Sequence, residues 1–197
     1  ECAFYLQAGS HSTADAFTHA ADDWFAWAAR DPEAAAAART DPAILQRCVY
    51  ETLRLHPASP VAQRRALAPI TLKGGTEIPE GSSVVLDLAA ANRDPSVFDR
   101  PDVFDPLREI PAEVPRWGHA FGGGMHACIG TELAGGVPSS EKAPSPDEAH
   151  DQVLGTVTLM LDALLGAGGR PDPDKAPQRD PHSARDHFAS YPVVFGE

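Results

Sequence analysis

Proline and glycine positions limit which parts of this chain can be regular. Nineteen prolines among 197 residues are about twice the usual share of roughly 5%. From Glu1 to Trp27 apolar residues recur at three- and four-residue steps, which predicts a helix with an interruption at Gly9 to Thr13. Two Asp-Pro pairs follow, each placing aspartate at a helix N-cap and proline in the first turn. They predict helices over 32–39 and 42–55.

The remainder of the chain is broken into short pieces. Prolines and glycines punctuate β-like runs over 57–88, which predicts a small antiparallel sheet. A turn-rich meander continues to the glycines at 121–124. After Cys128 a helical start stops at a glycine pair, and the polar, proline-rich residues 137–148 predict an inserted, flexible loop. A further helix, with Leu154 and Leu161 on one face, is expected from near 149, and the tail ends in a strand-like "YPVVF".

Charge and composition exclude several classes of protein. A formal net charge of −12 disfavours sequence-independent binding to nucleic acid or to an anionic lipid surface. Three cysteines are too few for a disulfide framework, so a reducing, cytoplasmic setting is expected. No apolar run approaches the roughly 20 residues of a membrane span, and the N-terminus lacks a signal-peptide pattern. The chain is therefore expected to be soluble, and its apolar opening "CAFYLQAG" predicts a helix that continues upstream.

The stretch "AFGGGMHACIG" places Cys128 in a glycine-rich loop. Three interpretations are open from the residues alone. Cys128 could be a buried structural thiol, or a zinc ligand together with His126 and His119. It could also be a thiolate ligand of a metal cofactor, because tight-loop N–H groups and the start of a helix both stabilise a negative sulfur.

The spacing of this loop resembles that of a known family. Phe121, Gly124, Cys128 and Gly130 fit the pattern FxxGxxxCxG, which is similar to the haem-binding loop of the cytochrome P450 family. Two more motifs support the resemblance: "ETLR" carries Glu51 and Arg54 in the spacing of the family's ExxR motif, and Arg108 stands where the third member of that salt-bridge network belongs. Glu51 and Arg54 alone could instead be a surface ion pair.

The resemblance implies a cofactor and its ligands. Haem b, iron protoporphyrin IX, would be bound with the Cys128 thiolate as the axial iron ligand. Arg64 and His126 would pair with the haem propionates, because two anions at the edge of a pocket need cations. The remaining residues expected in the cofactor site are Ala8, Phe121, Gly124 and Gly130.

The stretch "AGSHST", Ala8 to Thr13, resembles the oxygen-activating part of the family's long central helix. His11 occupies the position of the family's acid and Ser12 that of its threonine, with Thr13 following. A hydroxyl and an imidazole can both carry protons near neutral pH, so an altered proton relay is expected. Alternatively, His11 and Ser12 only solvate a kink. The residues expected to face substrate are Phe4, Gln7, Pro60 and Val61.

The resemblance extends from Glu1 to about Thr131. It implies one partial domain over 1–197. It would be mainly α with a small β-sheet: the C-terminal half of the P450 fold, with central helix, ExxR helix, meander, cysteine loop and last helix. The implied activity is a monooxygenase that oxidises a small organic substrate with electrons from a ferredoxin- or flavodoxin-type donor. A separate N-terminal half could complete it. The alternative is a non-catalytic P450 derivative that binds a partner. The insertion at 137–148 is either neutral or alters docking of the donor.

Overall fold

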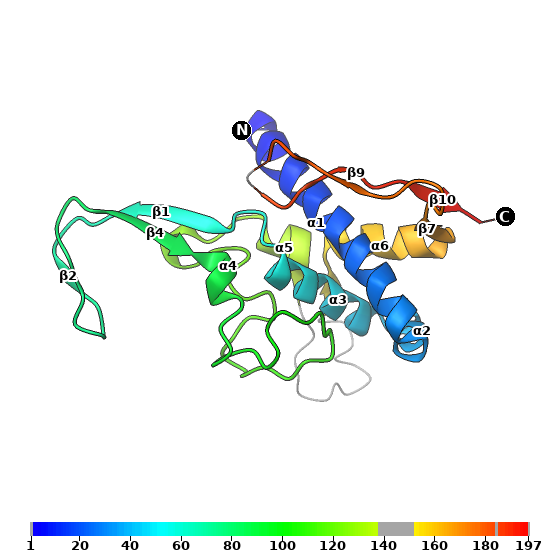
Figure 1. Ribbon diagram of the computed structural model, residues 1–197, viewed down its shortest axis with the longest axis horizontal. Helices are drawn as coiled ribbons and strands as arrows, with labels where there is room; N and C mark the ends of the chain where they lie inside the picture. Colours follow the sequence, from blue (N-terminus) through cyan, green and yellow to red (C-terminus); the bar gives the residue numbers. More distant parts are fainter. Residues whose placement is uncertain (1, 138–151, 184, 197) are drawn as a thin grey trace.

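The computed structural model describes residues 2–137, 152–183 and 185–196, without the side chains of residues 2, 4 and 5. Its first three elements are helices: α1 (Cys2–Arg30), α2 (Pro32–Thr40) and α3 (Pro42–Leu55) (Figure 1). The two helices predicted from Asp-Pro pairs are confirmed. Their capping carboxylates, Asp31 and Asp41, accept backbone N–H bonds at 3.0 and 2.8 Å.

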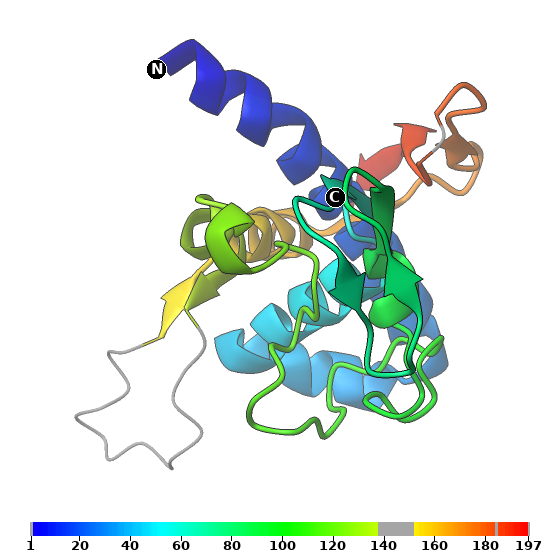
Figure 2. The ribbon, with the colours of Figure 1, turned by 90° about the vertical axis from the view of Figure 1, so that its left-hand side faces the viewer.

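The interruption predicted near Gly9 is wrong, because α1 is continuous across it. The Ser12 hydroxyl donates to the carbonyl of Ala8 at 3.1 Å, one turn back in the same helix. A side-chain hydroxyl can be satisfied in this way without breaking the helix. The first turns of α1 project beyond the rest of the fold (Figure 2).

The segment after α3 forms two separate ladders instead of the one small sheet predicted. β1 (Val61–Arg65) pairs antiparallel with β4 (Ser83–Asp87), and β2 (Ile70–Thr71) pairs with β3 (Glu77–Ile78). Prolines and glycines between these strands keep them short. A short helix, α4 (Leu88–Ala91), then leads into turns that continue to the 3₁₀ helix η1 (Gly124–His126), as the predicted meander required.

The helix after the cysteine loop is divided. α5 (Thr131–Gly135) is followed by β5 (Gly136–Val137), which pairs with β6 (Val153–Leu154). The last helix, α6 (Thr156–Gly166), begins only after this pairing. The helix predicted from near 149 is therefore wrong in its start: Leu154 lies in a strand, and 149–151 lie outside the described residues. So does the predicted loop 137–148, apart from Val137.

Close backbone contact explains why α6 begins so late. A Cβ at Gly155 would lie 2.3 Å from the carbonyl oxygen of Ala134, so only glycine lets the returning chain pass this close to the end of α5. Thr156 then donates from Oγ1 to the carbonyl of Leu133 at 2.9 Å. The two helices are thus joined by hydrogen bonds across the division.

The C-terminal segment closes against the helices. β7 (Gly169–Pro171) pairs with β10 (Val193–Phe195), which confirms the predicted terminal strand, and β8 (Gln178–Arg179) pairs with β9 (Phe188–Ser190). α1, α3 and α6 surround the apolar core, whose least exposed members include Ala38, Cys48, Val49, Val157 and Leu161. In the described part of the chain, no helix is both long and apolar enough to cross a membrane.

Candidate functional site

The structure brings Glu51, Arg54 and Arg108 together in a buried network. Arg54 donates from Nε and Nη2 to the two carboxylate oxygens of Glu51 at 2.8 and 2.7 Å. Arg108 donates from Nη2 to Oε1 of Glu51 at 3.0 Å. The three residues are 5%, 0% and 7% exposed in that order. Such burial excludes the surface ion pair that the spacing of Glu51 and Arg54 alone allowed.

Arg54 also fastens α3 to the irregular segment that follows α4, and Arg108 bonds within that segment. Arg54 Nη1 donates to the carbonyls of Asn92 and Pro101 at 2.6 and 2.8 Å, and Arg108 Nη2 donates to the carbonyl of Val103 at 2.6 Å. A guanidinium has five donors in a rigid fork, so it can hold several carbonyls of a segment that has no ladder of its own.

Asn92 is a residue whose role the sequence did not reveal. It is fully buried; its Nδ2 donates to the carbonyl of Arg54 at 2.9 Å, and its Oδ1 accepts from the backbone N–H of His119 at 2.7 Å. Gly118 makes this possible, since a Cβ there would lie 2.3 Å from that same oxygen. No motif named in the sequence analysis indicates this role.

A row of aromatic rings connects α3 with the cysteine loop. The rings of Tyr50 and Trp117 lie 5.0 Å apart, and those of Trp117 and Phe121 lie 5.7 Å apart, both edge to face. Phe121 therefore packs inward, half-buried. The loop that follows is held at one end by this row and at the other by α5.

The loop itself folds back around Cys128. The N–H of Cys128 donates to the carbonyl of Phe121 at 2.8 Å, and Gly124 adopts a φ of +61°, in the left-handed region that favours glycine. The N–H of Gly130 lies 3.4 Å from the Cys128 sulfur. This N–H is directed at the sulfur one residue before α5 begins.

Two of the three interpretations of Cys128 do not fit this geometry. The thiol is exposed, so it is not a buried structural cysteine; that position belongs to Cys48, whose pKa is raised by burial. Among the described residues, Cys128 is not part of any group of three metal-ligating side chains, so a zinc site with His119 and His126 is not formed. Ligation of a cofactor by Cys128 stays a prediction.

The residues expected to hold a cofactor at Cys128 have the chemistry that a flat, apolar and anionic group needs. Met125 and Ile129, which flank the cysteine, are 93% and 72% exposed and present an apolar surface. Arg64 is exposed, and its one described hydrogen bond, at 2.8 Å, goes to the neighbouring carbonyl of Gln63, which leaves other N–H donors available. His126 is exposed in η1. In their chemistry these residues fit haem: one thiol, two exposed apolar side chains and two basic side chains.

The residues expected on the opposite side of the cofactor lie on α1 and near β1. His11, Gln7 and Ala8 are exposed, and Ser12 and Thr13 are half-exposed. Val61 is 47% exposed at the start of β1, and the half-exposed Pro60 precedes it. The side chain of Phe4 lies outside the described part. No described hydrogen bond joins these residues to the cysteine loop, so their roles stay predictions.

Comparison with known proteins identifies the family. The cytochrome P450 family model matches residues 29–135, more than half of the chain. Cytochrome P450 105C1 of a Streptomyces species is 42% identical over 104 residues, which are 52% of this chain and 26% of that protein. Cytochrome P450 107B1 of Saccharopolyspora erythraea is 43% identical over 106 residues, which are 53% of this chain and 24% of that protein. The chain thus matches about a quarter of the length of these relatives.

Solved structures agree over nearly the whole chain. CYP154A1 from Streptomyces coelicolor A3(2) superposes with a TM-score of 0.74 at 27% identity, covering 98% of this chain and 43% of that one. CalO2 superposes with a TM-score of 0.72 at 25% identity, covering 98% of this chain and 42% of that one. The mainly α fold with small β elements is therefore confirmed as a part of the P450 fold. The chain belongs to the cytochrome P450 family.

Proposed function

We propose that this chain carries the haem-thiolate centre of a monooxygenase that oxidises a small organic substrate. The observation that carries the proposal is the exposed Cys128 sulfur, which faces the Gly130 N–H at the head of α5. The buried Glu51, Arg54 and Arg108 network supports it, since it holds the segment that leads into this loop. The cofactor proposed is haem b.

The residues around the loop would each do a definite task. Cys128 would bind the haem iron as thiolate, and Gly130 would hold part of its negative charge by hydrogen bonding. Arg64 and His126 would pair with the propionates, while Met125 and Ile129 would exclude water from the sulfur side. When bound, the haem supplies the redox and dioxygen chemistry.

Proton delivery is assigned to α1. Ser12 donates its own hydroxyl hydrogen to the carbonyl of Ala8, so its oxygen lone pairs are free to accept a hydrogen bond from a water. His11 is exposed and can exchange protons with solvent. Together with Thr13 they would hold and pass protons. Gln7, Ala8, Pro60, Val61 and Phe4 would shape the substrate pocket.

The partners follow from the same proposal. The electron donor is a ferredoxin- or flavodoxin-type protein, and the location is the cytoplasm. The chain matches about a quarter of its curated relatives' length. A separate N-terminal half is a further proposal for the remaining walls of the pocket. The second candidate function is a non-catalytic partner-binding derivative, favoured by the exposed apolar side chains of Met125, Ile129 and Leu133.

The test is optical. Purified protein is supplied with haem, reduced and exposed to carbon monoxide, and we expect a Soret band near about 450 nm from the electron-rich thiolate ligand. Cys128→Ala should abolish this band, and Cys48→Ala should retain it because that thiol is buried away from the loop. A band that survives Cys128→Ala would refute the assignment. Protein that stays colourless with haem would favour the partner-binding candidate.

A further inference from the structure

Residues 185–191, which we call the C-terminal strap, lie against α1 and the end of α3. The Nε2 of His19, on α1, is in hydrogen-bonding contact with the backbone carbonyl of Asp186, and the Tyr191 hydroxyl donates to Asp22 at 3.1 Å. His19 is only 2% exposed where the strap crosses α1. The strap therefore closes over a buried imidazole.

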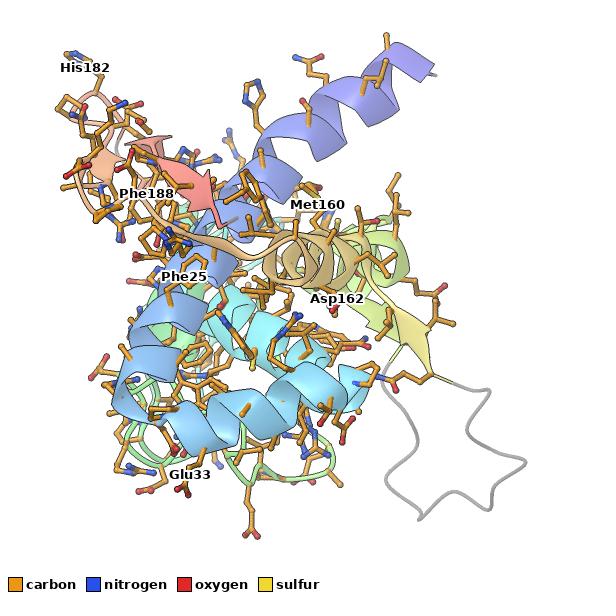
Figure 3. All side chains as sticks on the ribbon, turned by 90° about the vertical axis from the view of Figure 1, so that its right-hand side faces the viewer. Phe25, Glu33, Met160, Asp162, His182 and Phe188 are labelled. Atoms are coloured by element: carbon orange, nitrogen blue, oxygen red, sulfur yellow. The ribbon has the colours of Figure 1, made fainter. Side chains whose placement is uncertain are left out.

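Charged side chains make many of the contacts that hold the strap. Nε2 of His187 lies 3.3 Å from Oδ2 of Asp15 on α1. Arg179, on β8, lies 3.2 Å from the Asp186 carboxylate and packs over the ring of Phe188, 3.6 Å from its centroid (Figure 3). The side chains of Arg179 and Asp186 are 43% and 64% exposed. Ion pairs this exposed add little stability, so the strap is held weakly enough to open.

His19 has surroundings that suit a neutral ring while the strap is closed. Its Nε2 faces a carbonyl, which can only accept, so Nε2 carries the hydrogen and a second proton must go to Nδ1. That Nδ1 is buried and has no hydrogen-bond partner among the described residues. The Asp15 carboxylate lies 3.6 Å from Nε2, on the side of the existing hydrogen, and the His19 ring stacks on that of His56 with centroids 4.2 Å apart. Charging His19 under a closed strap therefore buries an N–H without an acceptor.

Protonation of His19 is thus linked to the position of the strap. Burial, followed by the charge of His56, lowers the pKa of His19 from its ordinary 6.5 to about 4. The closed strap binds fewer protons than the open one between these values, so its stability is complete above about pH 6.5 and is lost as the pH falls toward 4. Burial raises the pKa of Asp15 and of Asp22, which opposes part of this effect. The other charged groups that face His19 or its cavity are Asp23 on α1, Arg93 after α4, Arg179 on β8, and Arg185, Asp186 and His187 of the strap.

We propose that the C-terminal strap is an acid-sensitive cover of α1, closed while His19 is neutral and released when His19 takes up a proton. Release lets water solvate the imidazolium. It would also open a cavity of about 210 Å³ whose walls include His19, Asp15 and Pro60. Pro60 is expected to face substrate, so the consequence for substrate access rests on the proposed function, whereas the response of the strap to acid does not.

Hydrogen exchange of the full chain, without haem, tests the strap directly. A two-stranded hairpin is marginally stable alone, so β8 and β9 should lose amide protection once the strap leaves α1. Protection factors, which are intrinsic rates divided by measured rates, are compared for amides of 185–191 at pH 7 and pH 5. The two pKa values of His19 allow a fall of at most roughly 20-fold. We expect at least about 5-fold, because Asp15 and Asp22 act in the opposite direction, and amides of α6 should keep their protection.

His19→Gln removes the titrating ring and keeps an amide N–H that can donate to the Asp186 carbonyl. Its strap should show no fall in protection between pH 7 and pH 5. His182→Gln is the matched control, because His182 stands at the outer tip of the C-terminal loop (Figure 3) and its strap should respond as in the parent protein.

Carbon-13 NMR of the histidine rings gives a second measurement in the parent protein, which does not depend on how well His19→Gln folds. The His19 ring should titrate over the same pH range in which the strap loses protection. The proposal is overturned if the protection of 185–191 at pH 5 is within about 2-fold of that at pH 7, or if His19→Gln loses protection as the parent does. Titration of the His19 ring under a strap that stays protected would also overturn it.

Discussion

Arg54 and Glu51 form a two-point ion pair in which neither residue is more than 5% exposed. The pair lies on adjacent turns of α3, where three-residue spacing brings the side chains together. Because Arg108 binds the same carboxylate, the two cations share one acid. Further guanidinium donors of both arginines bind backbone carbonyls, which makes the arrangement tolerable in a dry interior.

Replacing Arg54 should therefore be far more damaging than replacing a surface arginine. Arg54→Ala leaves the Glu51 charge underpaired in the core and two carbonyls without donors, which should lower the free energy of unfolding by about 3–5 kcal/mol. Arg39→Ala is the control, since Arg39 pairs with Asp162 at 3.4 Å on the surface and should cost less than about 1 kcal/mol. Urea unfolding followed by circular dichroism measures both. Equal losses would contradict the buried network.

Gly118 should not tolerate a methyl group. Its φ is +56°, and a Cβ would lie 2.3 Å from the Asn92 carboxamide oxygen, so Gly118→Ala both strains the backbone and displaces the bonds that Asn92 makes to Arg54 and His119. We expect a loss of about 2–3 kcal/mol in unfolding free energy. Gly74→Ala is the comparison, because nothing lies within 4 Å of its Cβ position. A Gly118→Ala protein as stable as Gly74→Ala would rule out the close approach.

Local signals in the sequence predicted the elements that depend on local chemistry. The Asp-Pro pairs at Asp31 and Asp41 predicted α2 and α3 because capping acts within one turn. The start of α6 was not predictable, since it depends on how Gly155 passes the end of α5, a contact between separate segments. Periodicity alone places Leu154 on a helix face, whereas its pairing partner in β5 makes it a strand residue.

In the candidate site, too, sequence signals indicate some residues, whereas others depend on contacts between distant segments. The residues next to Cys128 left three interpretations open, and the resemblance of the loop to that of the P450 family implied a thiolate ligand, which stays a prediction. The structural role of Asn92 could not be recognised from the sequence, because it depends on contacts with α3 and with the chain before the cysteine loop.

Gln46 stabilises the β5–β6 pairing that separates α5 from α6. It is 1% exposed, its Nε2 donates to the carbonyls of Gly135 and Val153 at 2.9 and 3.2 Å, and its Oε1 accepts from Gln152 at 2.9 Å. Gln46→Leu would leave these buried groups unpaired, at a cost of about 1–3 kcal/mol. Gln63→Leu, on the exposed face of β1, should change stability by less than about 0.5 kcal/mol. Hydrogen exchange would report the difference: amides of 136–137 and 153–154 should lose protection only in Gln46→Leu.

Tyr50 should make the fold sensitive to alkali. Burial raises its pKa to about 12, although the hydrogen bond from Gln46 and the charge of Arg116 act in the opposite direction. A raised pKa in the folded state gives stability that is complete below the ordinary value of about 10 and is lost as the pH rises through about 12. Tyr50→Phe should remove that part of the alkaline loss. Absorbance at the tyrosinate band checks it: the difference between parent and variant should titrate near pH 12, and titration near 10 would contradict the burial.

The two described free thiols should differ sharply in reactivity. Cys128 is exposed and faces the Gly130 N–H, so a thiol reagent should label it readily in protein without haem. Cys48 is 1% exposed, and burial raises its pKa, so it should react only after unfolding. Peptide mapping by mass spectrometry distinguishes the sites. Addition of haem should then protect Cys128 and leave Cys48 unchanged, because a sulfur bound to iron is no longer a free nucleophile. If haem is retained while Cys128 is labelled at its original rate, the cofactor is bound elsewhere and the thiolate assignment fails.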